Sequence, residues 1–137
     1  GVSRESAKII LDQSENVKNG PAEALEAMHA IKEEARVMKE AILRGDFSGV
    51  VGSMQDGWKN KKKSAKSVSN RLIEEVYESA IEAGALAGKV SGAGGGGFMM
   101  FFVPPDKRMN VIRKLETYDG QVSNCHFTKH GCQAWRC

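Results

Sequence analysis

Residues 89–102 read KVSGAGGGGFMMFF and hold the feature around which the rest of the chain can be understood. Five of the six residues 92–97 are glycine, and glycine loses more backbone entropy on ordering than any other residue. The apolar run 98–103 follows at once and stops at Pro104, which is typical of a short buried strand. The stretch therefore predicts an ordered loop at the start of a core strand.

Residues 92–97 also match the dinucleotide-binding pattern G-x-G-x-x-G, with Glu116 and Asp119 roughly 20 positions further on. That mechanism needs a strand before the glycines and a helix after them, so that the helix N-terminus faces the pyrophosphate. The sequence indicates a helix before and a strand after, and no Lys-Ser or Lys-Thr pair completes a Walker loop. A linker would be polar and lie between domains. We favour a ligand-facing loop, approached by a phosphate or another loop, over a purely structural one.

Cap residues and apolar periodicity predict four helices before the glycines. Ser3 opens the first, Pro21 the second, Asp46 the third, and Ser69 or Asn70 the fourth. The side chains expected to face the core are, in helix order, Ala7, Ile10, Leu11 and Val17; Leu25, Met28, Ile31, Ala35, Met38 and Ile42; Phe47, Val50, Val51, Met54 and Trp58; and Leu72, Ile73, Val76, Tyr77, Ala80 and Ile81.

A short helix is predicted after the Pro-Pro pair that ends the apolar run. Residues 121–127 and 132–137 are predicted to form two further strands, joined by a turn over 128–131. This order favours an α+β fold with helices packed on a small, mostly antiparallel sheet, in one domain over 1–137. The residues of the short helix expected to point inward are Met109, Ile112 and Leu115.

Composition excludes several classes of function. The net charge of +3 is too small to require nucleic acid as a partner, and no apolar stretch approaches the roughly 20 residues of a membrane span. Cys125, Cys132 and Cys137 contain no C-x-x-C pair, so we expect a reducing cytoplasm rather than a disulfide framework. With His126 and His130 they are irregularly spaced for zinc, and we favour ordinary strand and turn residues.

Five lysines gather near the end of the third predicted helix, where cations favour the helix dipole. For most of them we favour a solvated helix end, because few aromatic residues accompany them as nucleic-acid binding would require. Lys89 either faces a cleft or ends the preceding helix. The five are Lys59, Lys61, Lys62, Lys63 and Lys66.

The segment 84–98, GALAGKVSGAGGGGF, resembles the third motif of the GHMP kinases, and the resemblance covers essentially the whole chain. Within that superfamily the sequence is most similar to the D-glycero-D-manno-heptose 7-phosphate kinases. The segments that carry this are Trp58-x-x-Lys61-Lys62, Ser69-Asn70, the FFVPP of residues 101–105 and the FTKHG of residues 127–131. The GVSR of residues 1–4 is similar to the family's Thr-Gly-x-Ser-Arg without its threonine.

The resemblance implies a ferredoxin-like GHMP kinase C-terminal domain. It belongs to an enzyme that transfers the γ-phosphoryl group of Mg-ATP to the anomeric hydroxyl of a sugar 7-phosphate. It also implies that Lys61 reaches a substrate phosphate. Arg4 lies at the expected start of the first helix, where an arginine either holds an anion or is exposed to solvent, and both alternatives stay open. The loop residues that the resemblance assigns to the nucleotide or substrate are Ser91, Gly92, Ala93, Gly94, Gly95, Gly96 and Gly97.

The family's ATP-binding motif, Pro-x-x-x-Gly-x-x-Ser-Ser, does not occur in these 137 residues. Because the chain starts at Gly1 rather than methionine, we expect a piece of a longer enzyme whose N-terminal domain holds ATP, Mg²⁺ and the catalytic residues. The piece alone is then expected to be inactive, and a homodimer is left open. Two alternatives remain: another family member (galactokinase, or mevalonate or phosphomevalonate kinase), and a stand-alone ferredoxin-like binding or regulatory domain without catalysis.

Overall fold

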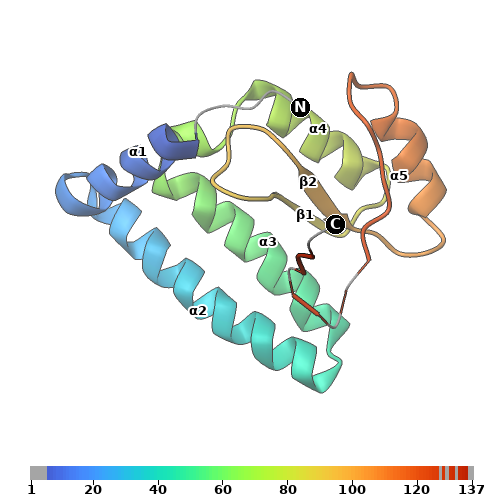
Figure 1. Cartoon of the computed structure of the whole chain (residues 1–137), viewed down its shortest axis with the longest axis horizontal. Helices are drawn as coiled ribbons and strands as arrows, with labels where there is room; N and C mark the ends of the chain where they lie inside the picture. Colours follow the sequence, from blue (N-terminus) through green and yellow to red (C-terminus); the bar gives the residue numbers. More distant parts are fainter. Residues whose placement is uncertain (1–5, 127, 129, 132, 136–137) are drawn as a thin grey trace.

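The computed structural model describes residues 6–126, 128, 130–131 and 133–135. In Figure 1 the long helices α2 and α3 lie side by side, and a β-hairpin lies between α3 and α4. The elements are α1 (Ser6–Asn19), α2 (Ala22–Arg44), α3 (Phe47–Ser64), the 3-10 turn η1 (Lys66–Val68), α4 (Arg71–Glu82), β1 (Ala87–Val90), β2 (Met99–Phe102) and α5 (Arg108–Leu115).

The starts of α3 and α4 confirm the predicted caps. Asp46 Oδ1 accepts a hydrogen bond from the Gly49 amide at 2.9 Å, and Asn70 Oδ1 accepts one from the Ile73 amide at 3.1 Å. Each bond satisfies a backbone donor that the first turn of a helix leaves free. Of the two residues predicted to open α4, Asn70 is therefore the cap.

The packing of α2 against α3 uses small side chains rather than the large apolar ones predicted. Ala24, Ala27 and Ala41 are buried, whereas Leu25 is exposed. A Cβ atom added to Gly49 of α3 would lie 3.0 Å from the Ala41 Cβ. At this end, next to the turn that joins them, the two helices therefore approach too closely for a larger residue at position 49. Other large apolar residues of the predicted α2 face that are exposed are Met28 and Ile42.

The predicted core face of α1 is wrong. Ile9 is buried against Trp58 and Val68, while Ile10 and Leu11 are exposed. Ile9, Ile10 and Leu11 are adjacent apolar residues, so the sequence does not determine which of them is buried. Packing against the cluster that contains Trp58 buries Ile9. The Ser3 cap lies outside the described residues.

The segment before the glycines is a strand, which the sequence analysis did not predict. β1 pairs antiparallel with β2, with Ala87 opposite Phe102 and Val90 opposite Met99. The glycines thus join two strands instead of following a helix directly. The dinucleotide-binding arrangement stays excluded, because a strand still follows the glycines where that arrangement needs a helix.

The strand after the glycines is shorter and less buried than predicted. It spans only Met99–Phe102, and Phe98 and Met100 are exposed. Phe47 of α3 is also exposed, contrary to its predicted inward position, although its ring lies 6.3 Å from that of Phe102. A two-stranded sheet covers little surface, so part of its apolar side remains open.

The last part of the chain departs furthest from prediction. The helix after the Pro-Pro pair is present, but it buries Val111 and leaves Met109 exposed. Where the structure describes residues 121–135, it contains no strand; Phe127, Cys132 and the last two residues of the predicted strands lie outside the described part. The α+β class itself is confirmed, with helices packed on a small antiparallel sheet. None of the described helices combines the length and apolarity needed to cross a membrane.

Candidate functional site

The glycine loop forms the tip of the β-hairpin and is packed against η1. The Ser91 amide donates to the Phe98 carbonyl at 2.8 Å and closes the loop. Gly94 has a φ of +122°, and a Cβ atom there would lie 2.6 Å from the Val68 carbonyl oxygen. Both the backbone conformation and the lack of space therefore require glycine at position 94.

Asn70 ties the loop to the start of α4. Its Oδ1 caps the helix, and its Nδ2 donates to the Gly95 carbonyl at 3.1 Å. The Gly95 amide in turn donates to the Val68 carbonyl at 2.7 Å. One side of the loop is thus held by the end of η1 and by the cap residue of α4.

Most amide groups of the loop keep their hydrogen-bonding capacity. Only the amides of Ser91 and Gly95 have an acceptor within the described part of the chain. Unpaired backbone N–H groups in a glycine-rich turn are suited to bind an anion. The loop amides left without an acceptor among the described residues are those of Gly92, Ala93, Gly94, Gly96 and Gly97.

Lys61 holds the other side of the loop. Its ammonium group, on the last turns of α3, donates to the Gly92 carbonyl. Burial lowers the pKa of Lys61 below the ordinary value for lysine, and the nearby charge of Lys89 lowers it further. The two ammonium groups are therefore close enough to repel each other beside the loop.

Lys62, the next residue, instead forms an ion pair within the fold and lies near two aromatic rings. Its ammonium group lies 2.8 Å from Glu74 Oε2 and 5.7 and 5.8 Å from the ring centres of Trp58 and Tyr77. Burial raises the pKa of Glu74, but hydrogen bonds from Lys62 and Ser69, with the charge of Lys62, bring it below its ordinary value. Contrary to the solvated helix end predicted for it, Lys62 is neutralised and half-buried.

A cleft of about 330 Å³ lies between α2 and α3 and is connected with the loop through Lys61, which donates to the Gly92 carbonyl. Lys61 and Lys89 line it together, and no carboxylate within the described residues lies within 4 Å of either ammonium group. Its remaining lining is mostly apolar and consists of Ile31, Glu34, Ala35, Met38, Ser53, Met54, Gly57 and Trp58.

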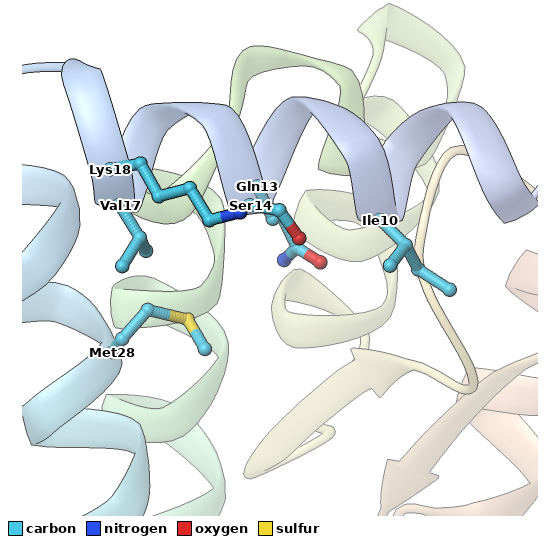
Figure 2. A pocket seen from close by; sticks show the side chains of 6 residues that line it. All are labelled: Ile10, Gln13, Ser14, Val17, Lys18 and Met28. Carbon is cyan, nitrogen blue, oxygen red and sulfur yellow. The ribbon is translucent and has the colours of Figure 1, made fainter.

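A second cavity, of about 320 Å³, lies between α1 and α2 (Figure 2). Val17 and Met28 point toward each other across it, and Lys18 extends along one edge. Its lining does not include Lys61, the residue that connects the α2–α3 cleft with the loop. The α2–α3 cleft is therefore the cavity that belongs to the candidate site.

Among the described residues, Lys61 is the predicted site residue that lines this cleft, and no residue of the loop 91–97 does. Arg4 lies outside the described residues. Lys63 forms an ion pair with Glu23 at 3.4 Å. In the described part of the chain, no three side chains of the metal-binding types gather into a cluster; Cys125 is exposed, and Cys132 and Cys137 lie outside that part.

Sequence reasoning left the position of Lys89 open and missed the anchor at Val68. Lys89 lines the cleft from a strand, so the alternative that it ends a helix is wrong. Alternation along a strand places it on the face opposite Gly88 and Val90, a pattern that four residues are too short to reveal. The contact with Val68 joins segments distant in sequence and leaves no local signal.

The comparisons with known proteins agree with this architecture. Residues 38–120 match the family model described as GHMP kinases C terminal. The chain is 44% identical over 135 residues to D-glycero-alpha-D-manno-heptose 7-phosphate kinase of Campylobacter jejuni, covering 98% of this chain and 39% of that protein. It is 29% identical over 93 residues to galactokinase of Mycobacterium bovis, covering 66% of this chain and 25% of that protein.

Solved structures show the same fold. L. major mevalonate kinase in complex with R-mevalonate superposes with a TM-score of 0.75 at 22% identity, over 85% of this chain and 36% of that one. A Campylobacter jejuni protein assigned as a sugar kinase gives a TM-score of 0.61 at 48% identity, over 78% of this chain and 33% of that one. The chain thus spans about two fifths of the length of the heptose kinase that it matches. On the family model and this similarity, the chain belongs to the GHMP kinase family and corresponds to its C-terminal domain.

Proposed function

We propose that this chain is the C-terminal part of an ATP-dependent sugar kinase. In the proposed reaction the γ-phosphoryl group of Mg-ATP passes to a sugar hydroxyl, the anomeric hydroxyl of D-glycero-D-manno-heptose 7-phosphate. The observation that carries the proposal is the glycine loop, with unpaired amides beside two lysines that have no acidic partner within the described residues. The 44% identity to a heptose 7-phosphate kinase supports the choice of acceptor.

The chemistry suits such a loop. Phosphoryl transfer spreads negative charge over the transferred group, and catalysis depends on positioning and on stabilising that charge. Loop amides act without a change of protonation, and the fixed anchor at Val68 and Asn70 limits their reorganisation. In this proposal residues 91–97 form one wall of the phosphate site, with Lys61 beside it.

The described residues do not fit a magnesium site of their own. Mg²⁺ prefers carboxylate oxygens and water, and no cluster of three His, Cys, Asp or Glu side chains occurs among them. We therefore assign ATP and Mg²⁺ chiefly to an N-terminal domain outside these 137 residues, together with the catalytic groups. This chain then contributes the glycine loop and the neighbouring lysines to the phosphate site.

The test is a phosphorylation assay of the complete gene product with ATP and four acceptors: heptose 7-phosphate, galactose, mevalonate and homoserine. We expect transfer to heptose 7-phosphate at the highest kcat/KM. Gly92→Ala should lower this kcat/KM by at least about tenfold, because a side chain at the loop displaces the phosphate. Gly52→Ala, in an open position within α3, is the matched control. Binding of these compounds without any transfer would favour a non-catalytic binding domain instead.

A further inference from the structure

Lys89 lies within the segment that resembles the third motif, but neither that resemblance nor the anchoring of the loop gives its side chain a role. It extends from β1 into the α2–α3 cleft, where Lys61 also lies. Lys89 is only half-buried, but its charge is felt at Lys61 and lowers the pKa of that residue. Two cations placed together have a cost in the free protein, which an anion between them would remove.

Other charged groups near the end of α3 do not supply that anion. Glu74 is taken by Lys62 at 2.8 Å, and Glu23 pairs with Lys63. Glu34 lines the cleft from α2, but within the described residues its carboxylate lies more than 4 Å from both ammonium groups. Lys61 and Lys89 therefore have no ion-pair partner within the described residues, and with Glu34 the titratable side chains that line the cleft carry a net charge of about +1.

We infer that Lys61 and Lys89 form a two-lysine clamp for the phosphate that the acceptor sugar already carries, so that the clamp selects phosphorylated acceptors over neutral ones. This inference rests on the proposed kinase function and adds Lys89 as a specificity-determining residue. Three donors on each ammonium group allow Lys61 to keep its bond to the Gly92 carbonyl while it binds a phosphate oxygen.

The shape of the cleft favours the acceptor over the nucleotide. A volume of about 330 Å³ lies at the lower end of ligand pockets, which are about 300 to 1,000 Å³. It suits a monosaccharide phosphate better than a nucleoside triphosphate. Apolar walls such as Ile31 and Met38 lower the local dielectric and strengthen the attraction between the lysines and a phosphate.

The test is calorimetric titration of the complete gene product, without turnover, with three probes: heptose 7-phosphate, the same heptose without phosphate, and ATP. The wild type should bind the phosphorylated heptose at least about tenfold more tightly than the neutral one, because only the phosphorylated heptose forms charge-assisted hydrogen bonds with the lysines. Lys89→Met should abolish most of this preference and leave the affinity for ATP unchanged. Lys89→Arg should retain it. The control is Lys59→Met, a change of an exposed lysine on α3, the helix that carries Lys61.

Several results would overturn the clamp. These are an undiminished preference in Lys89→Met, no preference for the phosphorylated heptose in the wild type, or a loss of ATP affinity in place of heptose affinity. Thermal melting of each variant checks that it is folded. If Lys89→Met does not fold, the same titration is carried out with Lys61→Met. Because the titration requires no transfer, its failure is distinct from a failure of the kinase assay.

Discussion

The glycine loop is held on two sides, and the two sides differ in how their polar groups are satisfied. On the anchored side, Gly94 lies against Val68, and both backbone polar groups of Gly95 are hydrogen-bonded, the amide to the Val68 carbonyl and the carbonyl to Asn70. On the cleft side, Gly92 meets Lys61, which with Lys89 has no acidic partner within the described residues.

The same difference separates two adjacent residues of α3. Lys62 is paired with Glu74, whereas Lys61 faces the cleft. Satisfied groups contribute to stability, and unsatisfied groups are available to a ligand. We therefore expect substitutions on the anchored side to change the free energy of unfolding, and substitutions on the cleft side to change anion binding.

The largest effect is expected from Gly94→Ala. Its Cβ would lie 2.6 Å from the Val68 carbonyl oxygen at a φ of +122°, so overpacking and backbone strain together should cost about 3 kcal/mol of unfolding free energy. Gly92→Ala is the matched variant, because it has a φ of +79° but no atom within 4 Å. It should cost about 1 kcal/mol. Urea denaturation measures both, and equal losses would show that the loop is not packed on η1.

A smaller loss is expected from changes at Asn70. Asn70→Ala removes both the cap of α4 and the bond to Gly95, at a cost of about 2 kcal/mol. Asn70→Asp keeps the capping oxygen and removes only the donor to the Gly95 carbonyl, so it should cost about 1 kcal/mol. Comparing the denaturation midpoints of Asn70→Ala and Asn70→Asp separates the contribution of the helix cap from that of the hydrogen bond to Gly95. If Asn70→Asp were as stable as the wild type, the anchor would contribute nothing.

The pair Lys62–Glu74 predicts a modest dependence of stability on pH. The folded state lowers the pKa of Glu74, so the stabilisation is present above the ordinary glutamate pKa and is lost as the pH falls through the lowered value. The effect should be less than about 1 kcal/mol, because both side chains are partly exposed. Glu74→Gln should show a flatter profile than the wild type between neutral pH and pH of about 3. Parallel profiles would contradict this role of Glu74.

The smallest effect is expected at Lys61, with the opposite sign. Because burial and Lys89 lower its pKa, the charged Lys61 weakens the fold at neutral pH, and this penalty is relieved as the pH rises toward the ordinary lysine pKa. Lys61→Met should therefore be as stable as the wild type or more stable by a few tenths of a kcal/mol. Lys89→Met should raise the pKa of Lys61, which NMR titration of the lysine side chain can follow. An unchanged pKa would place the two lysines too far apart to act together.

Much of the helical part of the fold could be predicted from local signals. Asp46 and Asn70 are caps whose chemistry acts within three residues, and the apolar run before Pro104 indicated β2 correctly in position. The chosen faces of α1 and α2 were not predictable, because burial of Ile9 and Ala41 depends on which helix lies opposite. β1 was not predicted because its four residues are too few to show a strand pattern, and its pairing with β2 is what makes it a strand.

The candidate site also has a part that the sequence predicted and a part that depends on the fold. Its glycines and Lys61 were visible in the sequence through spacing and resemblance. The convergence of Lys89 on Lys61, and the neutralisation of Lys62 by Glu74, depend on segments brought together by folding. The resemblance singled out Lys61 among the adjacent lysines of α3, but no local pattern predicted the ion pair of Lys62 with Glu74.

The most direct test of the account compares Lys61→Met with Lys62→Met in one experiment, measuring both unfolding free energy and affinity for heptose 7-phosphate. We predict a crossed result. Lys61→Met should weaken binding by about tenfold with no loss of stability, and Lys62→Met should lose up to about 1 kcal/mol of stability with binding unchanged. Equal effects of the two substitutions on both quantities, or the reverse assignment, would contradict the separation of an anchored side from a cleft side.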